Sequence, residues 1–285
     1  MKNKNGHYSA ISILLRNKLT VVGMVILILL AVTGILASVL SPYDPYEVDM
    51  ASKLLTPSLQ HPFGTDNFGR DILTRVLYGA RISLWLGLVS AGISFLAGTF
   101  LGAIAGYYQG TPGIVIMRLM DAVSSFPALI LAITIATLIG RGITSAVVAV
   151  GIVGIPDFAR LTYSQTMSVK KKGFVEAERA IGLTDGEILR KHIFPNCIST
   201  LVVRLTVNMG SAILIISALS FIGLGVQPPT AEWGCMISDG RNYIISGEWW
   251  LVTFPGAAIA LSVLSFNLIG DGIRDVLDPR CKTGA

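Results

Sequence analysis

The chain has 285 residues, of which 52% are hydrophobic and only 14% are charged, and its formal net charge is +5. An average soluble domain carries about 25% charged residues, so this chain has too few charges to cover a soluble globule. A disordered chain would need the opposite balance. The three cysteines, Cys197, Cys235 and Cys281, form neither a disulfide framework nor a paired metal motif.

Long stretches without charge predict membrane-spanning helices. The first, Leu19 to Leu40, has 22 residues and reaches about 33 Å, enough to cross a hydrocarbon core of roughly 30 Å. It is longer than the hydrophobic region of a signal peptide, about 7–15 residues, which argues against cleavage. The six helices expected in chain order are 19–40, 82–106, 118–140, 143–163, 203–224 and 250–270.

Two of these uncharged stretches are longer than one crossing needs, and each must also contain a loop. The segment Tyr107–Gly113 is expected to end the second span, because it contains Gly and Pro residues beside two interfacial tyrosines. The segment Gln227–Pro229 is expected to end the fifth span in the same way.

The Lys and Arg residues predict the orientation. With the N-terminus in the cytoplasm, sixteen of them lie inside and six outside, which favours cytoplasmic positions for both termini, residues 1–18 and 281–285. These basic residues mostly flank spans, and no basic patch with interleaved aromatics occurs, which argues against nucleic-acid binding.

The predicted external loop, residues 41–81, contains four prolines and five acidic residues against four basic ones. This balance is typical of a compact segment, so we expect an ordered extracytoplasmic loop rather than a free linker.

A second structured segment is predicted on the cytoplasmic side, within residues 164–202. A helical run from Phe174 to Ile181 is followed by Gly182, where a helix end favours glycine. The residues Thr184–Glu187 then form the pattern of a capping box, with Asp185 near the positive end of the helix dipole. A second helix is expected through Ile188, ending at Pro195. The sequence therefore predicts two short helices joined by a tight turn.

Three acid–base pairs lie three residues apart at the ends of spans. We interpret them as interfacial anchors on single helix faces, with a proton relay as the less favoured alternative. The pairs are Arg118 with Asp121, Asp157 with Arg160, and Asp271 with Arg274. In the second span Gly98 and Gly102 form a Gly-x-x-x-Gly pattern, which predicts close helix packing or a seam between subunits.

The sequence contains few residues that could form a metal, nucleotide-binding or catalytic site. The three histidines, His7, His61 and His192, lie in different segments, so no metal site is expected, and a pairing of His61 with Cys235 would supply too few ligands. No phosphate-binding Gly-x-x-x-x-Gly-Lys-Ser/Thr pattern occurs, so the chain is not expected to bind ATP by itself. We expect no cofactor and no catalytic set.

The cytoplasmic segment resembles the EAA loop of importer-type ABC permeases. The resemblance rests on Glu176-Ala177-Glu178, on Gly182, and on the close at Ile193-Phe194-Pro195. Two positions depart from the family pattern: Glu178 replaces the usual second Ala, and His192 stands where Ile is often found.

Further motifs resemble a narrower group, the C-type subunits of peptide and nickel permeases. They cover nearly everything after Pro42 and comprise His61–Asp71, Ser220–Pro229, Trp233-Gly234, Asp239–Arg241, Phe266–Asp275 and Leu277–Arg280.

The resemblance implies an all-α polytopic membrane protein with six transmembrane helices of the type I ABC importer permease fold. After the first helix, 19–40, and the loop 41–81, residues 82–280 would form a five-helix permease domain. Its segment 164–202 would couple the chain to ATPase subunits. The coupling residues implied are Glu176, Ala177, Glu178, Gly182, Leu183, Thr184, Asp185, Glu187, Ile188 and Pro195.

The same resemblance implies the partners and the function. A second permease subunit, two cytoplasmic ATP-binding subunits and an extracytoplasmic substrate-binding protein would complete an importer in the bacterial inner membrane, in contact with lipid. The expected substrate is a di- or oligopeptide, with a nickel or metal chelate as the alternative. A passive channel or ion-coupled carrier, the alternative from another class, would need intramembrane charges or broken helices. A membrane enzyme is the third possibility and lacks a catalytic set.

Overall fold

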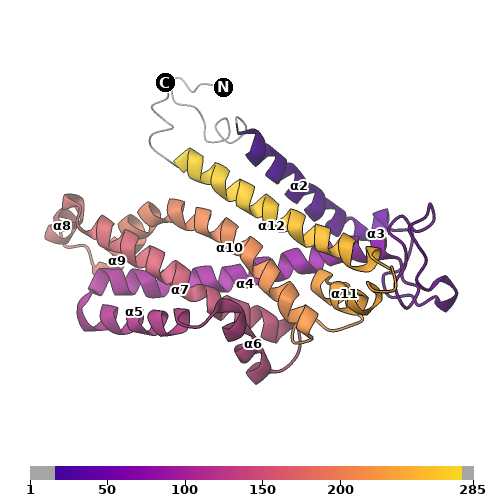
Figure 1. Cartoon of the computed structure of the whole chain (residues 1–285). Helices are drawn as coiled ribbons and strands as arrows, with labels where there is room; N and C mark the ends of the chain where they lie inside the picture. The colour runs from indigo at the N-terminus through magenta and orange to yellow at the C-terminus, as the bar shows by residue number, and fades with distance from the viewer. Residues whose placement is uncertain (1–16, 278–285) are drawn as a thin grey trace, which may run out of the picture.

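The computed structural model describes residues 17–277, and every named element in that range is a helix (Figure 1). The elements are α2 (Lys18–Ile35), α3 (Ala37–Leu40), η1 (Met50–Ser52), α4 (Ile72–Tyr108), α5 (Gly110–Ser124), α6 (Ala128–Ile139), α7 (Ile143–Lys170), α8 (Gly173–Ala180), α9 (Asp185–Ile188), η2 (Leu189–Ile193), α10 (Phe194–Ile222), α11 (Trp233–Gly240), η3 (Arg241–Tyr243) and α12 (Trp250–Leu277).

Five helical stretches are long and apolar enough to cross a membrane, and the bent pair α5–α6 makes a sixth. The prediction of an all-α protein with six spans is therefore confirmed for the described residues. The five are α2, α4, α7, α12 and the continuous stretch Asp185–Ile222, which contains α9, η2 and α10.

The long helices connect two distinct ends of the molecule. At one end lie the loop 41–71 and α11, and at the other lie α8 and α9 (Figure 1). The Trp250 indole at the start of α12 donates to the Thr65 carbonyl in the loop, 3.2 Å away. At the opposite end of α12, Asn17 donates to Asp275 across 3.1 Å. The two ends of the described chain therefore lie at the same end of the bundle as α8.

Each level of the bundle has its own apolar core. The core at the loop end joins α4, α10, α11 and α12 around Trp233 and Trp250. A middle core of small and branched side chains joins α4, α6, α7 and α10. The core at the end of α8 contains Tyr107, Phe158 and Ile188, so it ties the short helices to the spans.

The second span begins ten residues earlier than predicted, at Ile72 instead of residue 82. Asp71 caps this helix by accepting from the Thr74 amide at 2.7 Å. The Arg75 side chain, which argued against a helix in a membrane, is only 1% exposed and donates to the Pro45 carbonyl at 2.8 Å. Contacts within the protein replace water around the charge of Arg75, so the helix can include this residue. The expected loop 41–81 thus ends at residue 71.

The loop predicted at Tyr107–Gly113 is also absent from the described structure. Helix α4 continues to Tyr108 and α5 begins at Gly110, so only Gln109 separates them. Both Gln109 and Gly110 have positive φ, 52° and 51°, which turns the chain within two residues.

The third span, predicted as one helix over 118–140, is broken. Helices α5 and α6 meet at an angle of 94°, and Pro127 stands at the break. Proline disfavours a helical conformation in the residue before it and has no N–H for the helix ladder, so α6 starts afresh after it.

Pro195 does not end the second short helix, which corrects the prediction. The chain stays helical from Asp185 to Ile222, and Pro195 lies in the first turn of α10. The preceding residues Leu189–Ile193 form a π-helical turn. Proline has no N–H for the helix ladder, and the ladder departs from its regular α pattern in this π-helical turn directly before it.

Helices α4 and α7 pack closely, as the Gly98–Gly102 pattern predicted. A Cβ atom added at Gly98 would lie 2.5 Å from the Ile155 carbonyl oxygen, and one at Gly102 would lie 2.3 Å from that of Ala159. Only glycine permits this approach of the two backbones.

Candidate functional site

The turn between α8 and α9 has the geometry that its sequence predicted. Ile181 closes α8, and Gly182 follows in a backbone region with φ +92°. The Thr184 hydroxyl accepts from the Glu187 amide, and the Glu187 carboxylate accepts from the Thr184 amide, which completes the capping box. The two helix ends are therefore fixed by local hydrogen bonds.

Polar contacts attach this turn to α4. The Tyr107 hydroxyl donates to the Asp185 carboxylate and accepts from Arg179 at 3.1 Å. Arg179 also lies 3.6 Å from Asp185. The hydrogen bond with Tyr107 raises the pKa of the Arg179 guanidinium, so this side chain stays charged. Lys170, at the end of α7, donates to the Tyr107 carbonyl.

Apolar contacts complete the attachment. The side chains of Val175, Ile188 and Ile193 are buried in the same core as Tyr107. Of the ten predicted coupling residues, Ile188 therefore faces the bundle and anchors the turn.

The other nine predicted residues lie together at this end of the molecule with their side chains wholly or partly accessible. Those that are exposed are Glu176, Ala177, Gly182, Thr184, Asp185 and Pro195, and those that are partly buried are Glu178, Leu183 and Glu187. Residues 173–195 thus combine accessible side chains with buried contacts to the bundle, and we name them the coupling segment after the role that the resemblance implies.

The two departures from the family pattern contact each other. His192 Nδ1 lies 2.7 Å from Glu178 Oε1, and both side chains are partly buried. This pair links α8 to η2, so the two substitutions form one local contact rather than two independent surface changes.

A polar groove, which sequence reasoning did not predict, lies between α5–α6, α7 and α10. Its volume is about 530 Å³, and its lining includes Ser124, Asp157, Arg204, Asn208 and Ser211. The break between α5 and α6 borders the groove at Phe126.

Two ion pairs join α7 to neighbouring helices, and one of them, Asp157 with Arg204, lines this groove. Asp157 pairs with Arg204 of α10. Arg160 donates to Asp121 of α5 across 2.9 Å, and Arg118 also pairs with Asp121 within α5 at 3.9 Å, which confirms the first predicted pair. The predicted pairing of Asp157 with Arg160 is therefore wrong, because each residue meets a neighbouring helix. Among the described ion pairs, none joins the third predicted pair, Asp271 and Arg274.

These four charged side chains are about half exposed on the surface of the chain. A charge facing lipid is costly, so spans place their ionisable groups toward a bundle interior or a water-filled cavity. Asp157 and Arg204 are charged residues within otherwise apolar helices. They are the signal in the sequence from which this groove could have been predicted.

The loop end contains a different set of charges, and these are buried. Arg70 donates to Asp66 across 2.6 Å and lies 3.7 Å from Asp239 of α11, while Arg75 lies 3.6 Å from Asp66. Nearby, the fully buried Glu232 caps α11 by accepting from the Gly234 and Cys235 amides. This network joins the loop, α4 and α11.

The cysteines lie at opposite ends, with Cys235 in α11 and Cys197 in the core beneath the coupling segment. Burial raises the pKa of the Cys235 thiol to about 12. Both thiols are buried, so neither reports which side of the membrane it faces, and Cys281 lies outside the described residues.

The fold and these surfaces define a class: a multi-pass membrane protein with an exposed, capped turn at one end. Residues 98–283 match the family described as the binding-protein-dependent transport system inner membrane component. Residues 9–62 match the N-terminal transmembrane domain of oligopeptide transport permease C. The chain belongs to the family of binding-protein-dependent transport system inner membrane components.

Curated relatives resemble the chain over nearly its whole length. It is 43% identical over 268 residues to a dipeptide transport system permease protein of Alkalihalophilus pseudofirmus, covering 94% of this chain and 88% of the relative. It is 42% identical over 262 residues to a probable D,D-dipeptide transport system permease protein of Escherichia coli, covering 92% and 88%. A glutathione transport system permease protein of Escherichia coli is 43% identical over 270 residues, covering 94% and 88%.

Among solved structures, a chain of the inward-facing MetNI methionine ABC transporter superposes with a TM-score of 0.58 at 19% identity. The match covers 72% of this chain and 97% of that chain. This likeness confirms the ABC permease fold. Together with the family match, it makes the protein a multi-pass subunit of an inner-membrane importer.

Proposed function

We propose that the chain forms half of the translocation pathway of an ATP-driven importer of di- and oligopeptides. The observation that carries the proposal is the coupling segment, an exposed and doubly capped turn fixed to three spans. The substrate class is supported by the printed names of the relatives, which are peptide and glutathione permeases. None of these names favours the metal-chelate alternative.

The sides of the membrane follow from the same proposal. The coupling segment and both termini face the cytoplasm, and the loop 41–71 with α11 faces outward, where a substrate-binding protein docks. Two ATP-hydrolysing subunits meet the coupling segment, and a second permease completes the pathway. The chain itself carries out no catalytic step.

The polar groove is proposed to line the chain's half of the pathway. Its ion pair and the exposed break at Ser125–Pro127 both need water or protein beside them, because lipid satisfies neither charges nor free backbone groups. A broken span and intramembrane charges are also what a channel or carrier would need. The coupling segment, which such a protein would not require, favours the importer.

The coupling segment and the polar groove are proposed to be connected mechanically, through the helices that contain them. The stretch Asp185–Ile222 is continuously helical over 38 residues and is about 57 Å long. A displacement of α9 is therefore transmitted along α10 to Arg204 and Asn208 in the groove. The contacts of Tyr107 transmit the same displacement to α4. Closure of the ATPases would in this way open one side of the pathway and close the other.

The test is reconstitution in vesicles of this chain, a second permease, the ATPases and the binding protein, with uptake of a radiolabelled dipeptide as the measurement. We expect uptake only with all components, and no ATP hydrolysis by this chain alone. Uptake without the second permease would instead show that the chain works as a homodimer.

The coupling surface is tested by a reversal of charge at one exposed residue. Glu176→Lys should reduce uptake and the amount of ATPase that co-purifies, at unchanged membrane levels of permease. The matched control is Glu47→Lys, which reverses an exposed charge at the loop end and should leave ATPase attachment unchanged. Normal attachment and uptake with Glu176→Lys would contradict the proposed coupling surface.

A further inference from the structure

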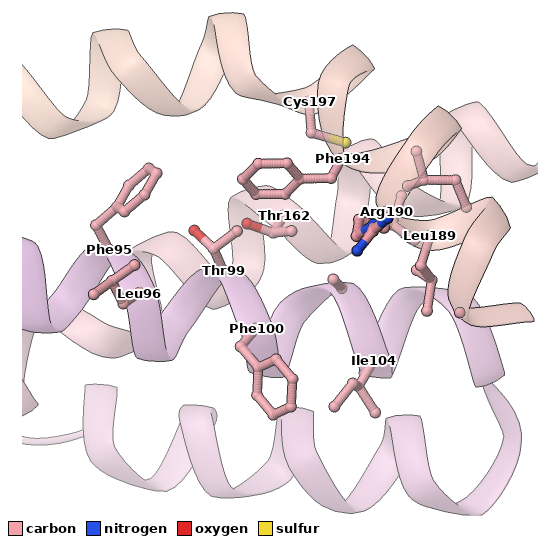
Figure 2. Close-up of a pocket in the computed structure, with 14 residues that line it drawn as sticks. Phe95, Leu96, Thr99, Phe100, Ile104, Thr162, Leu189, Arg190, Phe194 and Cys197 are labelled. Atoms are coloured by element: carbon pink, nitrogen blue, oxygen red, sulfur yellow. The ribbon is translucent and has the colours of Figure 1, made fainter.

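A second groove, separate from the polar one, lies between the bundle and the coupling segment, which supplies Gly186, Leu189, Arg190, Ile193 and Phe194 to its lining. It is bounded by α4, α7 and the stretch from α9 to α10, and its volume is about 520 Å³. Its walls are mainly apolar, with Phe95, Leu96 and Phe100 from α4 and Phe194 from α10 (Figure 2). No acidic side chain is among the described residues that line it.

The groove changes in polarity along its length. Figure 2 shows Arg190 at one end, Thr99 and Thr162 in the middle, and Phe95 with Leu96 at the other end. Arg190 is exposed, and it takes part in none of the ion pairs found within residues 17–277. The groove is therefore apolar over most of its length, with one cation toward one end.

The hydroxyl groups lack partners. Thr99 and Thr162 are 5% and 1% exposed, and in the described part of the chain their Oγ1 atoms form no hydrogen bond. Buried hydroxyls are almost always hydrogen-bonded. Both Oγ1 atoms are nevertheless shielded from solvent, so they offer no donor to a molecule in the groove, and Arg190 is the charged side chain that lines it.

The dimensions fit one leaflet of a bilayer. The α4 wall runs from Phe95 to Ile104, which is about 14 Å along the helix axis. Half of a hydrocarbon core is roughly 15 Å thick. Helix α4 is long and apolar enough to cross a membrane, and the inference places its part from Phe95 to Ile104 at the depth of the acyl chains.

We propose that this groove binds one anionic phospholipid from the leaflet on the side of the coupling segment. Arg190 pairs with the phosphate of the headgroup. One acyl chain lies along Phe95, Leu96 and Phe100. The inference rests on the position of the chain in a membrane and holds whatever the transported substrate is.

The test is native mass spectrometry of the purified, delipidated transporter, titrated with phosphatidylglycerol and separately with phosphatidylcholine. Wild-type protein should retain one phosphatidylglycerol at concentrations where phosphatidylcholine is lost. Arg190→Gln should weaken this binding by about five-fold, the effect of one basic contact with an anionic lipid. The matched control is Lys171→Gln, which removes an exposed charge near the same end but outside the groove and should bind as wild type does.

A second variant tests the apolar part. Ala103 lines the groove, and Ala103→Phe should fill it and abolish retention of both lipids while the transporter stays assembled. Equal retention by wild type and Arg190→Gln, or equal retention of the two lipids by wild type, would overturn the proposal. Loss of the second permease from Ala103→Phe, with lipid retention unchanged, would show that a protein helix occupies the groove and would also overturn it.

Discussion

At the loop end of the bundle, Asp66, Arg70 and Arg75 are buried and paired with one another. At the coupling end, Arg179 and Asp185 are also paired, but about half of each side chain is exposed. Removing one member of a buried pair leaves a charge without water or partner, whereas an exposed pair contributes little. The polar groups of the loop end are therefore committed to contacts within the chain, whereas those of the coupling end stay accessible at the surface.

The comparison is sharpened most by labelling the two ends from opposite sides of the membrane. In a Cys281→Ser background, the two native buried thiols should remain unlabelled. Leu59→Cys, at a fully exposed position of the loop, should react with an impermeant maleimide in intact cells. Ile181→Cys, at an exposed position of the turn, should react only in inverted vesicles. Labelling of Ile181→Cys in intact cells would reverse the proposed orientation.

The next largest effect is expected from the buried charges at the loop end. Asp66→Asn leaves Arg70 and Arg75 without their shared carboxylate and should reduce the free energy of unfolding by about 3–5 kcal/mol. The measurement is denaturant unfolding of the purified transporter. The control Glu47→Gln alters an exposed acid of the same loop and should change stability by at most about 0.5 kcal/mol. Equal stabilities would mean that the network does not hold this end.

At the coupling end, a substitution of Gly182 should act through the backbone conformation of this residue and not through crowding by neighbouring atoms. Its φ is +92°, and no atom lies within 4 Å of an added Cβ. Gly182→Val should therefore strain only the turn, by about 1–3 kcal/mol, and reduce uptake more than ten-fold without lowering permease levels. Gly182→Asn, which tolerates positive φ better, should keep most of the uptake. Equal loss of uptake in both variants would instead indicate that a partner protein packs against Gly182 and leaves no room for a side chain.

The smallest effect is expected at the capping box. Thr184→Ala removes the oxygen that accepts from the Glu187 amide and should destabilise the start of α9 by about 0.5–2 kcal/mol. Faster hydrogen exchange across residues 185–190 should report this change, with a reduction of uptake smaller than that of Gly182→Val. Thr184→Ser restores the acceptor and should exchange as wild type does. Unchanged exchange in Thr184→Ala would show that other contacts hold the turn.

The sequence alone determined the features that depend on neighbouring residues. Uncharged length predicted the spans, because a helix must hide its backbone in lipid over about 20 residues. The order of Gly182, Thr184 and Glu187 predicted the capped turn, since each contact there joins residues at most a few positions apart. The ends of these elements were less predictable: the charge of Arg75 suggested a loop, and its contacts with Pro45 and Asp66 make a helix possible there.

Only the tertiary structure decided the partners of the charges and the continuity of the helices. Asp157 and Arg160 have the spacing of a pair within one helix, yet they contact Arg204 and Asp121 because α7 lies between α10 and α5. Pro195 has the local character of a helix end, yet the π-helical turn before it lets α10 continue from α9. Both grooves arise in the same way. Their lining residues come from segments far apart in the chain, and their proximity depends on how the helices pack.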